Sequence, residues 1–222
     1  MSRTVKLQLL VLCCLPSPAM AEQDAQLWTS MSVTAPLGSR FEVQADANMR
    51  WYDNATDMAR VQVRGMLAVK LGSGVLLGGG YSYIRNEEDD GSFEHEDRVF
   101  QQLSLPLAKI GKAQLVGRTR MEQRMYRGEG TVWRFRQQVR LNIPLQGPEG
   151  LRFSLSVEPL FLLNQPDAED DPTGFDEFRT AAAVFIPLAG RLGVEVGYLN
   201  QYSFPGENEM NHILNIGFSA RF

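Results

Sequence analysis

Cysteine and histidine are both scarce in this 222-residue sequence. The two cysteines, Cys13 and Cys14, are adjacent near the amino terminus, and the two histidines are His95 and His212. If the leading segment is removed, no cysteine remains, which excludes a disulfide framework and a thiolate metal site. No zinc, P-loop or dinucleotide-binding signature occurs, so the sequence indicates no cofactor and no metal site.

The amino-terminal segment has the pattern of a secretory signal peptide. Basic residues at positions 3 and 6 precede an apolar run at 9–15, and Ala19-Met20-Ala21 forms a small-x-small cleavage site. The apolar run is too short to cross a membrane as a helix. A lipoprotein signal ending at Cys13 fits poorly, because bulky residues precede that cysteine. We expect residues 1–21 to be removed and residues 22–222 to form one domain.

Long hydrophobic runs are also missing. The mean hydropathy is −0.21, and no run approaches the length of a transmembrane helix. Loss of the two basic residues of the leader leaves 20 Lys and Arg against 26 Asp and Glu, a net charge of −6. A polar average is nevertheless compatible with a membrane β-barrel, because lumen-facing residues dilute the hydropathy of every strand.

The last segment of the chain alternates between apolar and polar residues. Counting back from Phe222, every second residue to Leu214 is largely apolar, and the intervening residues are polar or small, with Ile213 as the exception. Successive side chains of a strand point to opposite faces, so this segment is a strand with one apolar face. A chain that ends on such a strand with an aromatic residue is typical of bacterial outer-membrane barrels.

The same period of two extends along nearly the whole chain. The predicted strands are Gln26–Ala35, Arg40–Tyr52, Met58–Leu71, Val75–Arg85, Arg98–Leu107, Ala113–Met125, Thr131–Leu145, Leu151–Leu163, Phe175–Leu188, Leu192–Tyr202 and Met210–Phe222. Short turns, mostly with glycine, alternate with longer polar loops that are usually acidic. The pattern predicts an all-β fold, a transmembrane antiparallel up-and-down β-barrel of about 10–12 strands, with Phe222 on the periplasmic side and the acidic loops outside.

An odd number of strands leaves the place of residues 26–35 open, because bacterial single-chain barrels have even numbers. This segment lies in the lumen or at the rim of a ten-stranded barrel, or a twelfth strand accompanies it. In the third option, the first and last strands of an eleven-stranded barrel pair in parallel.

Aromatic residues gather at the predicted outer ends of the strands. We expect one girdle at the membrane–water boundary, made of Trp28, Trp51, Tyr52, Tyr81, Tyr83, Trp133, Tyr198 and Tyr202. The alternative is a soluble, lipocalin-like binding barrel in the periplasm, in which the apolar faces would point inward and the arginine-rich faces outward.

The predicted inward face is rich in arginine. Its central charge network comprises Arg118, Arg120, Glu122, Arg124, Arg134, Arg136, Arg140, Glu158, Glu177, Arg179 and Glu195. The same face also carries Arg50, Arg60, Arg64, Arg98, Arg152, Glu42 and Asp46. Arginine keeps its charge, so we expect the glutamates to bind the guanidinium groups in bidentate pairs. The network either closes a rigid lumen or leaves an anion-attracting channel or cavity.

A hydrolase or lipid-modifying enzyme is the alternative function. His95 lies in Phe93-Glu-His-Glu-Asp97, in a predicted acidic outer loop, where it is the candidate general base. His212 is expected on the lipid-facing side. Neither is followed two residues later by a serine. The acidic residues 87–97 and Asp167–Asp171 supply oxygen ligands but follow no calcium-binding motif, so we expect solvated loops.

Short motifs along the strands resemble the uncharacterised bacterial family known as domain of unknown function 2490. They are Trp28, Asp97-Arg-Val-Phe-Gln-Gln-Leu103, Arg118-Thr-Arg-Met-Glu-Gln-Arg124, Arg134-Phe-Arg-Gln-Gln-Val-Arg140, Phe178-Arg179, Gly197-Tyr-Leu-Asn-Gln-Tyr202 and the closing strand to Phe222. The resemblance implies a small outer-membrane barrel with no established activity, and it assigns no catalytic residue. We therefore expect a non-enzymatic structural or narrow channel protein. Its expected partners are membrane lipid, lipopolysaccharide and, through the last strand, the barrel-assembly machinery, with no nucleic acid.

Overall fold

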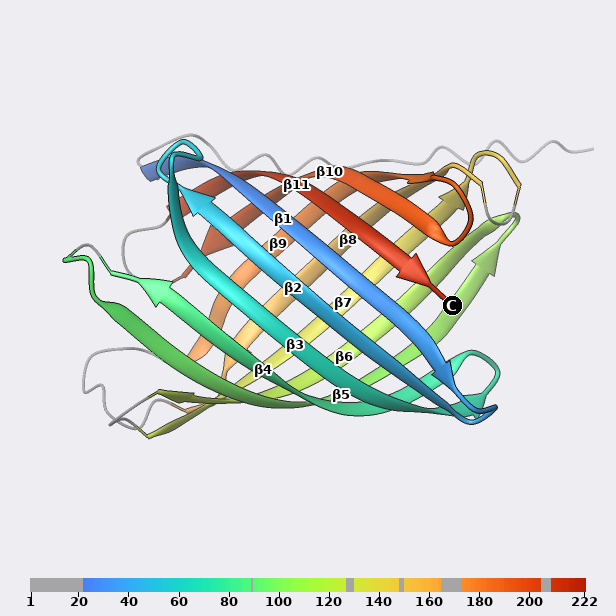
Figure 1. Ribbon diagram of the computed structural model, residues 1–222, viewed down its shortest axis with the longest axis horizontal. Helices are drawn as coiled ribbons and strands as arrows, with labels where there is room; N and C mark the ends of the chain where they lie inside the picture. The colour runs from blue at the N-terminus through green and yellow to red at the C-terminus, as the bar shows by residue number, and fades with distance from the viewer. Residues whose placement is uncertain (1–21, 89, 127–129, 148–149, 165–172, 205–208) are drawn as a thin grey trace, which may run out of the picture.

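A computed structural model describes residues 22–88, 90–126, 130–147, 150–164, 173–204 and 209–222. These residues form a closed barrel of eleven strands (Figure 1). The strands are β1 (Glu22–Leu37), β2 (Phe41–Tyr52), β3 (Asp57–Gly72), β4 (Val75–Glu87), β5 (Phe93–Ile110), β6 (Ala113–Tyr126), β7 (Thr131–Pro144), β8 (Arg152–Leu162), β9 (Gly174–Pro187), β10 (Leu192–Ser203) and β11 (Glu209–Arg221). The predicted all-β barrel is therefore confirmed. The predicted signal peptide and the acidic run Asp167–Asp171 lie outside the described residues.

Consecutive strands pair in antiparallel fashion and follow one another around the barrel. Short turns join them at one end, which is on the right in Figure 1, and the longer loops lie at the other end. We call these the turn end and the loop end. Glycine makes the short turns possible. Gly38 between β1 and β2 and Gly190 between β9 and β10 have φ angles of +69° and +65°, in the left-handed region that other residues rarely adopt.

The barrel closes by pairing its first strand with its last. β1 lies parallel to β11, with Leu27 beside Leu214 and Val33 beside Ala220, and β1 is antiparallel to β2 on its other side. Of the three arrangements left open by the odd strand count, the parallel closure is the one observed. β1 is thus a wall strand, and neither a lumen segment nor a twelfth strand is needed to close the described sheet.

Side chains sort between the two faces of the barrel as the period of two predicts. Arginines and glutamates of β5–β9 are buried in the lumen, while apolar residues such as Met31, Val63 and Leu67 are exposed on the outside. The soluble alternative requires the opposite arrangement. Within the described residues, no helix has the length and apolar character needed to cross a membrane.

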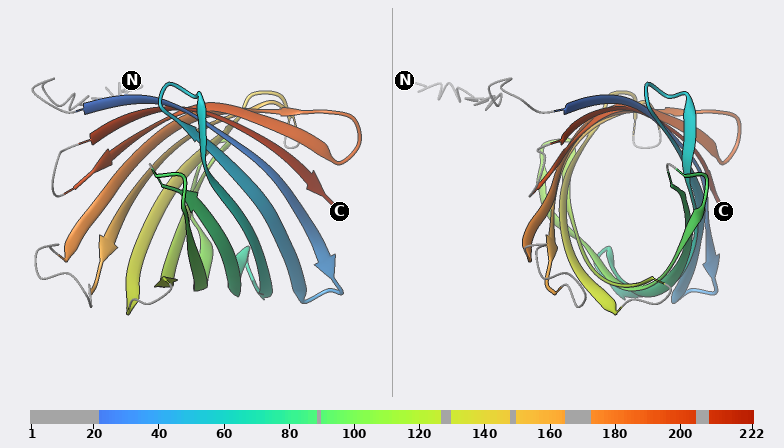
Figure 2. Two further views of the ribbon diagram at one scale, coloured as in Figure 1. Left: turned by 60° about the vertical axis from the view of Figure 1, so that its left-hand side comes forward. Right: turned by 90° about the vertical axis from the view of Figure 1, so that its left-hand side faces the viewer.

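Aromatic side chains fill part of the lumen opposite glycines. Phe100 on β5 is buried against Met66 and Ala68. A Cβ on Gly80 would lie 2.5 Å from the Phe100 ring, and one on Gly193 would lie 2.2 Å from the Phe185 ring. These two glycines leave the space that the rings occupy. The oval ring of strands in Figure 2 is therefore narrower inside than its ribbon indicates.

Two sequence predictions about local structure are wrong. β5 begins at Phe93 rather than at residue 98, so residues 94–97 are strand residues and not loop residues. Two members of the predicted aromatic girdle lie elsewhere, because Trp28 is buried in the lumen and Tyr52 lines the same cavity as Trp28 at the loop end. The rings of Tyr81, Tyr83, Trp133 and Tyr198 are exposed on the outer face, as expected.

Candidate functional site

Three cavities lie along the lumen. The outer cavity, about 480 Å³, opens at the loop end and is lined by Asp24, Gln26, Trp28, Tyr52, Asp53, Asn54, Gln201, Glu209 and Asn211. The inner cavity, about 790 Å³, lies at the turn end, and its charged lining residues are Lys109, Lys112, Arg118, Arg140, Arg152, Glu195 and Arg221. The central cavity, about 480 Å³, shares Trp28 with the outer cavity and Arg118 with the inner one. The three cavities therefore form a series.

The central cavity is strongly basic. Of the described residues, nine arginines line it, namely Arg50, Arg60, Arg64, Arg98, Arg118, Arg124, Arg134, Arg136 and Arg179. Only two carboxylates share that lining, Asp46 and Glu177. Asp46 accepts a hydrogen bond from Arg64 Nε at 2.8 Å. Arginine does not lose its proton in proteins, so the lining of this cavity is positively charged, and Glu96, Glu122 and Glu158 offset part of that charge from outside the lining.

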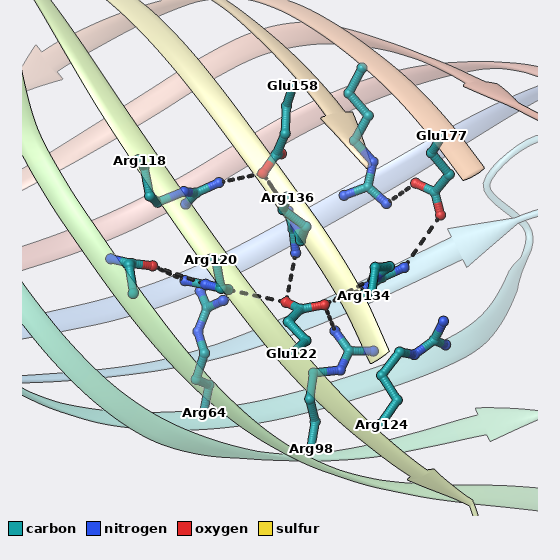
Figure 3. Close-up of polar contacts among 12 residues, drawn as sticks. Arg64, Arg98, Arg118, Arg120, Glu122, Arg124, Arg134, Arg136, Glu158 and Glu177 are labelled. Atoms are coloured by element: carbon teal, nitrogen blue, oxygen red, sulfur yellow. Dashed lines mark hydrogen bonds and ion pairs between the residues drawn. The ribbon is translucent and has the colours of Figure 1, made fainter. Parts of the chain in front are cut away.

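Glu122 is the centre of the charge network behind one wall of the cavity (Figure 3). Its side chain is fully buried, and four arginines surround it from three strands. Arg134 donates to Oε2 at 2.9 Å and Arg136 to Oε1 at 3.1 Å, while Arg98 and Arg120 lie at 3.3 and 3.6 Å. Glu122 is on β6, and register places it directly opposite Arg134 on β7.

Glu158 on β8 forms a second node of the network. Its Oε1 accepts hydrogen bonds from Arg118 at 2.8 Å and from Arg136 at 3.1 Å. Arg136 thus bridges Glu122 and Glu158, and Figure 3 shows its side chain between the two carboxylates. This bridge joins strands β6, β7 and β8 across the lumen face.

Glu177 and Glu195 are also paired with arginine. Glu177 accepts a hydrogen bond from Arg179 and lies 3.7 Å from Arg134, and Glu195 lies 2.5 Å from Arg140 at the inner cavity. The four glutamates predicted to form bidentate pairs are Glu122, Glu158, Glu177 and Glu195. Among the described contacts, none of them binds a single arginine through both of its carboxylate oxygens. Arg134 instead directs Nε and Nη2 to one oxygen of Glu122.

Glu96 makes the bidentate contact that was expected of other glutamates. Its two oxygens accept from Arg124 Nε and Nη2 at 3.0 and 3.1 Å, and Arg98 lies 2.5 Å from the same carboxylate. Glu96 is absent from the predicted network because residue 96 was predicted to lie in a loop. The parity of β5 could have found it, since Glu96 stands two residues before Arg98, on the same face.

Trp28 forms the boundary between the outer and central cavities. The Arg50 guanidinium lies 3.6 Å from the centroid of the Trp28 ring, and the Arg179 guanidinium lies at 5.4 Å. Gln26 accepts a hydrogen bond from the Trp28 indole at 2.9 Å, which fixes the ring. Cations beside an indole face are attracted by the ring quadrupole, so the ring holds both arginines at the cavity entrance.

Both histidines lie away from the lumen cavities, on the outer face. The Tyr83 hydroxyl is 2.6 Å from His95 Nδ1, and the Tyr198 hydroxyl is 2.6 Å from His212 Nδ1. His95 lines none of the three lumen cavities. The geometry therefore gives no support to His95 as a general base beside a serine or aspartate.

The acidic loop residues do not converge on a cation site. Asp97 accepts a hydrogen bond from Tyr81 on the outer face, and Glu94 accepts one from Asn86. Hydrogen bonds from Ser92 hold the pKa of the exposed Asp90 carboxyl below its usual range. In the part of the chain that the structure describes, no group of three or more metal-binding side chains occurs.

Comparison with known proteins matches the chain to a family without an assigned activity. Residues 25–211 match the model of the family described as "Protein of unknown function (DUF2490)". An uncharacterized protein of Methylorubrum extorquens is 26% identical over 229 residues, covering all of both chains. Among solved structures, the translocator domain of the autotransporter NalP from Neisseria meningitidis aligns with a TM-score of 0.48 and 10% identity, over 81% of this chain and 74% of that domain. The family match confirms the resemblance indicated by the strand motifs.

Proposed function

This chain belongs to the family described as Protein of unknown function (DUF2490), and we propose that it forms an outer-membrane β-barrel whose lumen is a narrow pore for small anions. The observation that carries the proposal is the central cavity, where nine arginines face two carboxylates. Rings of Arg and Lys select anions in pores, because the fixed positive charge replaces the hydration that the ion loses.

The outer face of the barrel supports a membrane location. Exposed large apolar side chains occur on every described strand except β6, and Tyr81, Tyr83, Trp133 and Tyr198 stand among them near the loop end. A contiguous exposed apolar surface of this extent is unusual for a soluble monomer. Outer-membrane lipid and lipopolysaccharide are the proposed surroundings. The barrel-assembly machinery is the proposed partner of β11, which leads to Phe222.

The charges at the two mouths favour the attraction of anions at the turn end over the loop end. Six basic residues and one glutamate line the inner cavity, while the outer cavity has three acidic residues and no basic residue in its described lining. Charges at an open mouth are screened by salt over about 10 Å at 0.1 M ionic strength. The confined arginines are screened less, so the interior determines which ions pass.

The residues shared between neighbouring cavities support a path for anions along the lumen. Trp28 belongs to the lining of two neighbouring cavities, and so does Arg118. At each boundary a guanidinium is present, because Arg50 lies on Trp28 and Arg118 is itself the shared residue. An anion that moves along the axis therefore meets arginine at both boundaries.

Planar-bilayer recording tests this function. The refolded barrel in a tenfold KCl gradient is expected to give small unitary currents with a reversal potential on the anion side, because the interior is basic. Arg118→Gln removes the charge at the inner boundary and should shift the reversal potential toward zero. Arg85→Gln, which removes an arginine of the outer face beside Phe93, is the control and should leave it unchanged. Cation-selective currents would contradict the proposal.

A closed, structural barrel is the second candidate, and the buried Glu122 network favours it. Charged groups that are fully buried and paired across three strands are suited to fixing the shape of a wall. This candidate predicts no steady current in the same recording from protein that is folded and inserted. An enzyme is not proposed, because both histidines lie on the outer face.

A further inference from the structure

Arginines face one another directly across three strand pairs on the lumen side. In the described sheet, the register places Arg50 opposite Arg60, Arg98 opposite Arg124, and Arg120 opposite Arg136. Like charges that are directly opposite on neighbouring strands destabilise a sheet. Each pair therefore needs an anion between or beside its two guanidinium groups.

Two of the three pairs have a carboxylate that serves both arginines. Glu96 lies 2.5 Å from Arg98 and 3.0 Å from Arg124. Glu122 lies 3.6 Å from Arg120 and 3.1 Å from Arg136. The chain itself supplies the counter-charge at these two places.

The Arg50–Arg60 pair lacks such a carboxylate among the described residues. Arg60 approaches Glu96 only at 3.8 Å, and Glu96 already serves the Arg98–Arg124 pair. Arg50 donates its Nε to the neutral Asn48 at 3.1 Å and rests on Trp28. Glu177, the other carboxylate of the cavity on this side, is bound to Arg179 and attracts Arg50 without a hydrogen bond or close ion pair to it, so no one carboxylate of the described residues serves both Arg50 and Arg60.

Arginine nitrogens without a hydrogen-bond acceptor also lie around the Arg50–Arg60 pair. Arg60 Nε and Arg179 Nε are buried without a hydrogen-bond partner in the described structure, and the Arg179 residue is only 8% exposed. Within the described residues, the Arg50 side chain donates a hydrogen bond through Nε alone, and its two terminal nitrogens make none. Arg179 reaches this region from β9 across the lumen, because it and Arg50 both lie over Trp28.

We propose that Arg50, Arg60 and Arg179 form a binding site for a small oxyanion of the phosphate class in the central cavity. The site supplies the counter-charge that the third arginine pair lacks. Planar guanidinium groups bind two oxygens of one anion at once, which favours phosphate over chloride. The proposal deepens the pore function on which it rests, since it names the class of anion that the cavity retains.

Equilibrium binding of inorganic phosphate tests the site without any measurement of current. Refolded residues 22–222 in detergent are titrated with phosphate by calorimetry in Tris chloride, with chloride replaced so that ionic strength stays constant. The wild-type barrel should show saturable binding. Arg50→Gln or Arg60→Gln should weaken it by about tenfold or more, because each removes a charged donor from the site.

Stability in phosphate-free buffer shows whether these variants fold. Relief of the repulsion between Arg50 and Arg60 should raise the urea midpoint of either variant, while phosphate should no longer raise it further. The matched control is Lys70→Gln, which removes one positive charge from the lumen side of β3, where Lys70 lies 3.9 Å from Glu42. Its phosphate affinity should stay within about twofold of wild type, since exposed ion pairs contribute little.

Phosphate binding and bilayer current together distinguish a failure of the phosphate site from a failure of the pore function. Saturable phosphate binding without current would sustain the site and remove the pore function. Anion-selective current with phosphate binding that is absent, or that falls equally in Lys70→Gln, would overturn the site and leave the pore function standing.

Discussion

Glu122 has the most heavily used side chain of the described network. It is fully buried, and its two oxygens serve Arg98, Arg120, Arg134 and Arg136. A buried charge that loses its partner carries an uncompensated desolvation cost. Here one carboxylate compensates several guanidinium groups at once, so its loss affects all of them together.

Replacement of Glu122 by glutamine keeps the shape of the side chain and removes its charge. We expect Glu122→Gln to lower the free energy of unfolding by about 3–5 kcal/mol, the range for a broken buried ion pair. Urea titration of the refolded barrel measures this. Glu42→Gln, at a half-exposed pair with Lys70, should cost less than about 1 kcal/mol. Equal losses in the two variants would contradict a central role for Glu122.

At the residue scale, strand parity predicted the inward direction of the network because most of its side chains alternate with apolar residues along their strands. It could not predict which carboxylate each guanidinium reaches, since those contacts cross between strands. Glu96 was missed because acidic neighbours made its segment look like a loop. Trp28 was assigned to the girdle by its position near a strand end, although its parity matches the lumen-facing Gln26.

At the scale of elements, β1 is the strand whose partner the sequence left open. Its length and alternation predicted a strand, but alternation does not state which neighbour a strand takes or in which direction it runs. The parallel pair with β11 arises from the odd number of strands. When ten turns reverse the chain ten times, the first and last strands run the same way.

A disulfide across the β1–β11 pair tests the closure. The register places Ser32 beside Ser219, and residues 22–222 contain no other cysteine. Ser32→Cys with Ser219→Cys should form an intramolecular disulfide on oxidation, seen as faster migration on non-reducing gels. The control pairs Ser32→Cys with Asn211→Cys, eight residues along β11 and so about 26 Å away. Cross-linking of the control instead of the first pair would refute the observed register.

At the scale of the whole molecule, the outward apolar face tests the proposed membrane setting. Val63, 54% exposed in the middle of β3, should tolerate arginine in water but not in lipid. We expect Val63→Arg to lower the free energy of unfolding in phospholipid vesicles by about 2–4 kcal/mol, as for charges on the lipid face of barrels. Leu37→Arg, equally exposed but at the turn end, should cost about 1 kcal/mol or less. Two near-neutral variants would instead indicate a soluble barrel.

The parallel contact between β1 and β11 also has a consequence for how the chain folds. Every other strand pair joins neighbours in sequence, so each can form as a hairpin. The β1–β11 pair instead joins the first and last strands of the described chain. Loop-closure entropy and contact order make such a contact slow. Until it forms, the sheet is open and presents two free edges, which readily pair with the edges of other chains. Closure of the β1–β11 contact is therefore the step at which correct folding competes with aggregation. A higher protein concentration favours aggregation at this step, because pairing between chains becomes faster.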